Sequence, residues 1–144
     1  CGVARFIVAA PSYLSRYGRP GHPRDLTAHH CLGYAYRSRQ DVWRFSNGGD
    51  EETITPSGPL RVTNADALVP TVLDGLAIAE LPEFIASEYL ADGRLESILT
   101  DWPLPIGGLY FVTPSARSRP AKVAALVDFF VERLSEPEWR WPRG

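Results

Sequence analysis

The side chains best suited to ligand chemistry lie at two predicted strand-to-helix junctions within residues 60–82, LRVTNADALVPTVLDGLAIAELP. Asn64 follows a short alternating strand, and its side chain suits the cap of the next helix. The second junction follows the apolar segment LAIA, where Pro82 fits the first turn of another helix. Free backbone N–H groups and the helix dipole make such junctions anion sites in open α/β sheets. The same spacing also suits an ordinary βαβ unit that binds nothing.

The sequence predicts neither a catalytic centre nor a metal site. His22, His29 and His30 lack the spacing and neighbouring carboxylates of metal ligands, so capping or surface roles suit them better. No G-x-S-x-G elbow or comparable nucleophile motif occurs. Cys1 and Cys31 lack zinc-ligand or redox spacing, and we expect both thiols to be reduced. We therefore expect no enzymatic activity, no metal and no cofactor.

Composition and charge predict a globular protein that contacts neither nucleic acid nor membrane. The chain has 144 residues, of which 44% are hydrophobic and 22% are charged. The net charge of −2 and a single lysine, Lys122, argue against a grip on a phosphate backbone. No apolar run approaches the roughly 18 residues that span a bilayer, and no signal-peptide pattern occurs. We expect a cytoplasmic protein, and the absence of Met suggests a fragment.

The first half of the chain predicts parallel units that carry a small antiparallel meander. The segment RFIVAA at residues 5–10 has the composition of a central strand, and residues 12–18 form a short helix closed by glycine. Residues 31–36 predict another strand. Val42, Trp43 and Phe45 suggest its antiparallel partner, and the turn signal NGGD follows before the segment at residues 53–55.

The second half predicts a further series of alternating helices and strands. They are a helix at residues 83–90, strands at residues 95–99 and 109–113, and a helix at residues 121–134. We expect Phe84 and Ile85 to face inward. Gly75 suits a left-handed position just after a helix, and Pro70 predicts a kink or a late helix start. The last helix carries an apolar stripe at i, i+3, i+4 and i+7 spacing.

Several short motifs follow one another along most of the chain. They are RFIVAAPSYL, YGRP, HPRDL, WRF, GPL, NADAL, LDGLAIA with LP, GRL, LYFVTP and a final KV-containing helix. No single motif is diagnostic. Their order and spacing together resemble the effector-binding domain of LysR-type transcriptional regulators.

The resemblance implies an α/β fold like that of type 2 periplasmic binding proteins, with two lobes joined by crossover strands. The implied divisions are residues 1–10, a remnant strand of the first lobe; residues 11–108, a nearly complete second lobe; residues 109–135, a strand and helix returning to the first lobe; and residues 136–144, a tail. The family's N-terminal winged helix-turn-helix is missing, so DNA contact is expected only through that part. We expect the fragment to dimerise or swap elements, because its final helix lacks a cover for its apolar stripe. For the full-length protein the resemblance implies a dimer or a tetramer.

The same resemblance assigns the effector contacts of the second lobe. They are Thr63, Asn64, Ala65, Glu80, Leu81 and Pro82. Thr63 and Asn64 offer side-chain donors beside free helix N–H groups, which suits a polar or carboxylate-bearing effector, although a plain cap also explains Asn64. Glu80 departs from the family, which commonly has an apolar residue there. It would repel an anionic ligand, pair with a cationic or hydroxylated one, or be an exposed loop acid without a role.

The sequence thus predicts an effector-sensing regulatory domain in which a small molecule between two lobes shifts lobe closure. Two alternatives stay open. One is a solute-binding receptor of similar fold that serves transport. The other is an enzyme on this scaffold, which would require a convergent His, Asp and Ser cluster.

Overall fold

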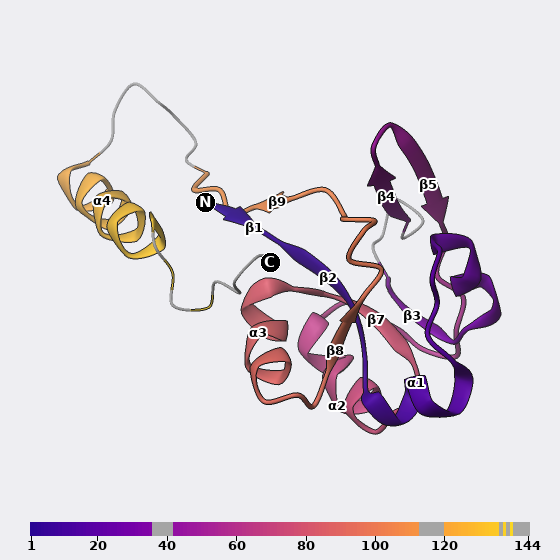
Figure 1. Cartoon of the computed structure of the whole chain (residues 1–144). Coiled ribbons are helices and arrows are strands. Elements are labelled where there is room, and N and C mark those ends of the chain that lie inside the picture. The colour runs from indigo at the N-terminus through magenta and orange to yellow at the C-terminus, as the bar shows by residue number, and fades with distance from the viewer. Residues whose placement is uncertain (36–41, 113–119, 136, 138, 140–144) are drawn as a thin grey trace.

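The structure is a computed structural model that describes residues 1–35, 42–112, 120–135, 137 and 139. Its main body is a five-stranded sheet in the order β6-β3-β7-β2-β8 (Figure 1). The strands are β2 (Arg5–Ala9), β3 (Cys31–Tyr34), β6 (Arg61–Val62), β7 (Ile78–Pro82) and β8 (Glu96–Ile98). β3 is parallel to β6 and β7, whereas β2 is antiparallel to β7 and β8. The segment RFIVA therefore lies inside the sheet, as predicted.

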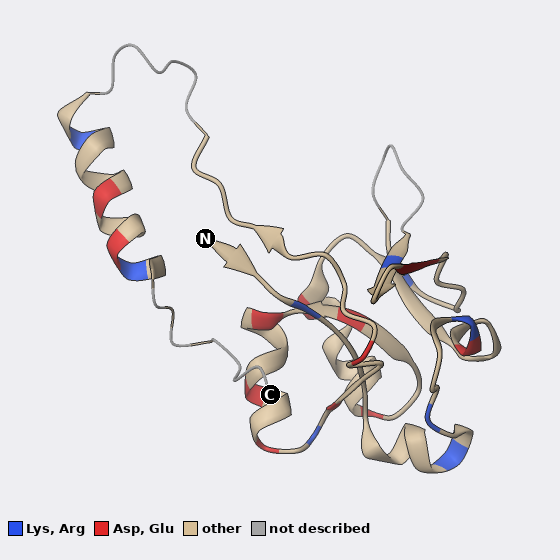
Figure 2. Cartoon of the chain, turned by 45° about the horizontal axis from the view of Figure 1, so that its top comes forward, with Lys and Arg blue, Asp and Glu red and all other residues tan. Residues whose placement is uncertain are grey.

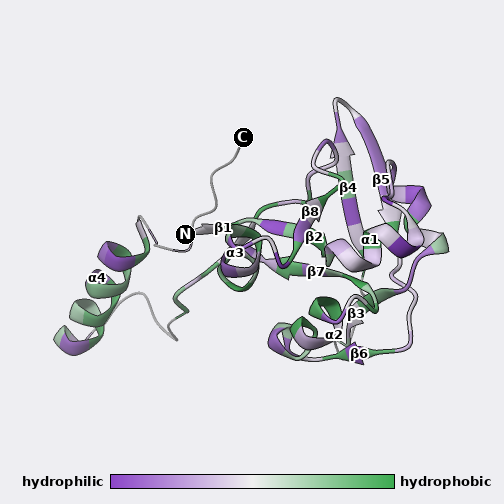
Figure 3. Ribbon diagram, turned by 60° about the horizontal axis from the view of Figure 1, so that its bottom comes forward, coloured by the Kyte–Doolittle hydropathy of each residue, from purple (hydrophilic) through white to green (hydrophobic). Residues whose placement is uncertain are grey.

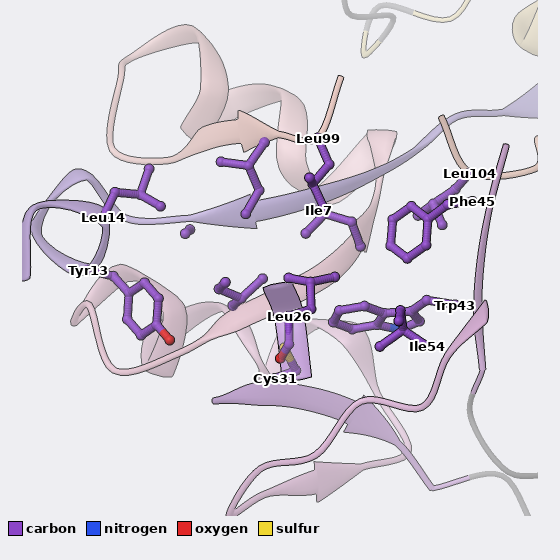
Figure 4. Close-up of a cluster of buried hydrophobic side chains, with 13 residues drawn as sticks. Ile7, Tyr13, Leu14, Leu26, Cys31, Trp43, Phe45, Ile54, Leu99 and Leu104 are labelled. Atoms are coloured by element: carbon purple, nitrogen blue, oxygen red, sulfur yellow. The ribbon is translucent and has the colours of Figure 1, made fainter. Parts of the chain in front are cut away.

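Two hydrophobic layers cover the opposite faces of the sheet. The covering elements are α1 (Pro11–Tyr17), the 3-10 helix η1 (Pro23–Ala28), β4 (Trp43–Asn47), β5 (Asp50–Ile54), α2 (Val69–Leu73) and α3 (Glu83–Ala91). Side chains alternate along each strand. Val8 and Leu81 therefore pack with α2 and α3, while Ile7 and Ile78 pack with α1, η1 and the β4–β5 hairpin. Figure 4 shows Ile7 within this second layer. In Figure 3 the strand β7 is mostly hydrophobic, whereas β5 is mostly hydrophilic.

The predicted pairing of the segment around Trp43 with residues 31–36 is wrong. β4 pairs with β5 in an isolated hairpin, whose turn holds Gly48 at φ 58° and Gly49 at φ 111°. The physical reason is that both edges of β3 are already occupied, by β6 and β7. Trp43 and Phe45 instead bury their rings in the hydrophobic layer under the hairpin (Figure 4).

The predicted strand at residues 109–113 is also wrong where the structure describes it. The strand β9 is only Gly107–Gly108, paired with β1 (Gly2–Val3). Beyond it the Leu109 amide donates to the Cys1 carbonyl at 2.9 Å, and the Cys1 ammonium donates to the Leu109 carbonyl at 3.2 Å. Tyr110 and Val112 are 85% and 86% exposed. Residue 113 lies outside the described residues. Residues 110–112 form no strand because no described strand pairs with them.

The last helix, α4 (Ala121–Ser135), confirms the predicted helix and stands away from the sheet (Figures 1 and 2). None of its described residues is buried. Large apolar side chains on it are exposed: Leu126, Phe129, Phe130 and Val131. The apolar stripe predicted from the sequence is therefore present on the helix and uncovered within the described chain.

The helix α3 places a different residue inward than predicted. Phe84 is 46% exposed and its ring contacts that of Trp139, with centroids 6.3 Å apart. Glu83 and Ala86 are buried instead, while Ile85 is partly buried. The helix begins at Glu83 and ends with the C-cap Asp92, as the sequence indicated. Trp141 of the tail lies outside the described residues.

Candidate functional site

The ends of β6, β3 and β7 and the start of β2 lie together along one edge of the sheet, the edge that runs across the ends of the strands. Tyr34 lies beside Val62 in the parallel β3–β6 pair, and Arg5 lies opposite Pro82 in the antiparallel β2–β7 pair. β6 leads into the 3-10 helix η2 (Ala65–Ala67), and β7 leads into α3. Two helix starts therefore lie at the carboxyl ends of two parallel strands, which is where open α/β sheets hold ligands.

Asn64 forms the predicted helix cap. Its Oδ1 accepts a hydrogen bond from the Asp66 amide at 3.0 Å, and both Thr63 and Asn64 are exposed. The α-helix itself starts late, at Val69, so that Pro70 falls in the first turn, where its missing N–H costs no hydrogen bond. The cap uses the amide oxygen of Asn64, so its NH₂ group takes no part in the cap.

Glu80 is not an exposed loop acid. It lies in β7 and is 2% exposed. The Arg5 Nε donates to Glu80 Oε1 at 2.6 Å, and Arg5 Nη2 forms an ion pair with Oε2. This pairing arises because Glu80 lies opposite Ile7, so that Arg5, two residues away, projects from the same face of the sheet. A ligand cation would have to displace a guanidinium that is already bound.

Leu81 and Pro82 occupy structural positions at the end of β7. The Leu81 side chain is fully buried against the α2 and α3 layer, and Pro82 provides the N-cap of α3 without a side-chain hydrogen bond. Pro82 was expected in the first helical turn and lies one residue before it. The apolar strand also starts later than expected, at Ile78, with Leu76 55% exposed.

Glu83 is a buried acid at this edge that sequence reasoning did not single out. It is 1% exposed, and its Oε2 accepts a hydrogen bond from the Ala4 amide at 3.2 Å. The Glu83 amide in turn donates to the Ala4 carbonyl at 2.9 Å. The position of Glu83 after Pro82 could have indicated an acid in the first turn of a helix, where acids are favoured. Nothing in the sequence pattern indicated its contact with Ala4.

The histidines and Cys31 have structural roles away from this edge. The His22 Nδ1 accepts from the Arg24 amide at 3.2 Å and so caps η1. The His29 ring forms a hydrogen bond with the Tyr13 hydroxyl at 3.1 Å. Burial raises the pKa of the Cys31 thiol to about 12. Among the described residues, no group of three or more His, Cys, Asp or Glu side chains has an arrangement that would hold a metal ion.

Lys and Arg residues are distributed over several elements of the described chain (Figure 2). Within the described residues, no helix combines the length and the apolar composition that a membrane span requires.

Comparison with known proteins identifies a single family. The model of the LysR substrate binding domain matches residues 3–135. The chain is 33% identical over 140 residues to the HTH-type transcriptional regulator PtxR of Pseudomonas aeruginosa, covering 97% of this chain and 45% of PtxR. It is 34% identical over 136 residues to an HTH-type transcriptional regulator of Xanthomonas campestris, covering 90% of this chain and 39% of that protein. The chain thus spans less than half of these relatives.

Solved structures agree with the sequence comparison. The full-length Vibrio cholerae virulence activator AphB matches with a TM-score of 0.80 and 26% identity, over 92% of this chain and 45% of AphB. The regulatory domain of AphB from Vibrio vulnificus matches with a TM-score of 0.72 and 26% identity, over 92% of this chain and 66% of that domain. The fold is therefore that of LysR-type regulatory domains, which resembles the periplasmic binding proteins.

Proposed function

This chain belongs to the LysR substrate-binding domain family, and we propose that it is the effector-sensing domain of a LysR-type DNA-binding transcription regulator. The observation that carries the proposal is the convergence of two helix starts, at Asn64 and Pro82, on one edge of the sheet. Free N–H groups at such starts favour a polar or carboxylate-bearing small molecule. The contact residues proposed for it are Thr63, Asn64, Ala65, Glu80, Leu81 and Pro82.

DNA contact would belong to another part of the whole protein. Relatives described as HTH-type regulators are more than twice as long as the matched region, and this chain has a net charge of −2. The proposed arrangement keeps residues 11–108 as the second lobe, to whose sheet β2 (Arg5–Ala9) adds a strand, so that the division at residue 10 does not hold for β2. Residues 1–4 and 109–135 stay as elements of the first lobe, and residues 136–144 as a tail. A winged helix-turn-helix N-terminal to these lobes would bind the operator.

Signal transmission would proceed through lobe closure. An effector that contacts both lobes favours the closed arrangement by its difference in affinity for the two states. A dimer or tetramer of the whole regulator, in the cytoplasm, would convert that shift into a change in DNA geometry. The named relatives, which are transcription regulators, favour this role over a transport receptor or an enzyme.

The test uses the full-length regulator and two changes at Asn64. A thermal-shift screen of small metabolites identifies a stabilising compound, and titration calorimetry measures its Kd. Asn64→Asp keeps an oxygen that caps η2 but removes the NH₂ donors and adds a negative charge, so we expect weaker binding with an unchanged melting temperature. Asn47→Asp, at the end of β4 away from the proposed site, is the matched control. Unchanged affinity in Asn64→Asp would remove Asn64 from the site.

A further inference from the structure

The outward edge of the Arg5 guanidinium is the strongest unassigned feature of the proposed site. Resting on the proposed function above, we propose that Arg5 anchors a carboxylate of the effector. Arg5 is then a specificity-determining residue that selects anionic effectors over neutral molecules of the same shape.

The geometry of the Arg5–Glu80 pair leaves one side of the guanidinium available. Glu80 engages Nε and Nη2 from one side. A guanidinium carries five N–H donors, so both donors of Nη1 and one of Nη2 face elsewhere. Within the described part of the chain, Arg5 has no side-chain hydrogen bond or ion pair apart from those to Glu80. The ion pair thus holds the guanidinium in one orientation and presents a second fork, which is the geometry that carboxylates bind.

The Arg5 guanidinium is more exposed to solvent than the carboxylates of Glu80 and Glu83 beside it. The Arg5 side chain is 33% exposed, whereas that of Glu80 is 3% exposed and Glu83 as a whole is 1% exposed. The oxygens of Glu80 are bound to Arg5, and one oxygen of Glu83 accepts from the Ala4 amide. An incoming ligand therefore meets N–H donors at this place and not carboxylate oxygens. An anion fits this surface better than a cation.

The place of Arg5 in the sheet defines the shape of the ligand. Arg5 lies opposite Pro82, the N-cap of α3, at the same edge as Asn64. Three strand spacings separate β2 from β6 in the sheet, or roughly 14 Å. A molecule that contacts both Arg5 and the Asn64 amide must be elongated, with its carboxylate toward β2. Arg5 is also two residues from β1, so its ligand would act directly on the β1–β2 segment.

The experiment compares acids with their uncharged amides on the full-length regulator. The probes are matched pairs such as benzoate with benzamide and succinate with succinamide, extended to a library of small acids and screened by thermal shift and calorimetry. We expect the binders to be acids, with each amide bound at least about tenfold more weakly, as the loss of a charge-assisted fork implies. A library in which no acid binds, or in which amides bind equally well, would overturn the proposal.

Variants then assign the binding to Arg5. The double change Arg5→Gln and Glu80→Gln removes the guanidinium without leaving a buried unpaired carboxylate, and should weaken acid binding by about tenfold to a hundredfold. Arg94→Gln removes an exposed guanidinium beyond the far end of α3 and should have no effect. If binding depends on Asn64 and is unchanged in the double variant, the Arg5 anchor is wrong while the proposed function stands. If the full-length protein binds no DNA, the proposed function itself fails.

Discussion

Glu83 binds both backbone groups of Ala4. Its carboxylate accepts from the Ala4 amide at 3.2 Å, and its own amide donates to the Ala4 carbonyl at 2.9 Å. The start of α3 is thereby attached to the residue that joins β1 to β2. This attachment lies at the edge of the sheet where we propose that the effector binds.

The contact predicts a stability loss that depends on the replacement. Glu83→Ala leaves the buried Ala4 amide without its acceptor and should reduce the free energy of unfolding by about 1–3 kcal/mol. Glu83→Gln keeps an oxygen acceptor and should cost less. Urea denaturation measures both, with Glu88→Ala on the exposed side of the same helix as the control. Equal losses for Ala and Gln would show that the hydrogen bond to Ala4 contributes nothing.

Gly75 and Gly93 both have a positive φ, but only Gly75 has other atoms close to the position of an added Cβ. Gly75, at φ +68°, would place a Cβ 2.3 Å from the Ser12 Oγ, whereas Gly93, at φ +75°, has no atom within 4 Å of that position. Gly93→Ala should therefore show only the backbone cost, about 1–2 kcal/mol. Gly75→Ala should cost more, measured by thermal or urea unfolding. A Gly75 variant as stable as the Gly93 variant would contradict the close contact between α1 and the end of α2.

Cys31 should be unreactive in the folded protein. Burial raises the pKa of its thiol to about 12, and the Sγ lies 3.5 Å from the Leu26 carbonyl oxygen. The thiolate is the reactive form, so iodoacetamide at pH 8 should label the exposed Cys1 and leave Cys31 unmodified until the chain unfolds. Peptide mass spectrometry before and after denaturation measures this. Rapid native labelling of Cys31 would mean that β3 opens readily.

The carboxylate of Asp25 should make stability depend on acid pH. Hydrogen bonds from the His22 and Gly21 amides lower the pKa of Asp25 below its ordinary value. A lowered pKa contributes stability above the unfolded value, near 3.9, and that contribution disappears as the pH falls through the folded value. Asp25→Asn should therefore flatten the decline in unfolding free energy below about pH 4. Asp50→Asn is the control, and identical pH profiles for Asp25→Asn and wild type would contradict the cap.

The uncovered face of α4 should cause this chain to self-associate. Leu126, Phe129 and Phe130 are each more than 40% exposed, and exposed apolar patches favour association. Sedimentation velocity of the 144-residue chain should show a mass that increases with concentration. The change Phe129→Gln with Phe130→Gln should reduce it, and Lys122→Gln should not. A monomer of constant mass at high concentration would contradict the prediction.

The sequence alone determined the features that depend on a few neighbouring residues. The Asn64 cap, the left-handed Gly75, the late start of α2 at Pro70 and the His22 cap all follow from backbone chemistry within one or two turns. The ordered motifs also identified the family, because they preserve the spacing of elements that a shared fold requires.

Only the tertiary structure decided the features that depend on a partner distant in the sequence. Glu80 is buried because Arg5, 75 residues away in the chain, projects from the neighbouring strand. β4 could not join β3 because both edges of β3 were occupied, and residues 109–112 formed no strand because no described strand pairs with them. A β-strand needs a partner for its backbone groups, and a buried charge needs one for its charge. The sequence contains both partners of the Arg5–Glu80 pair, but only the fold brings them together.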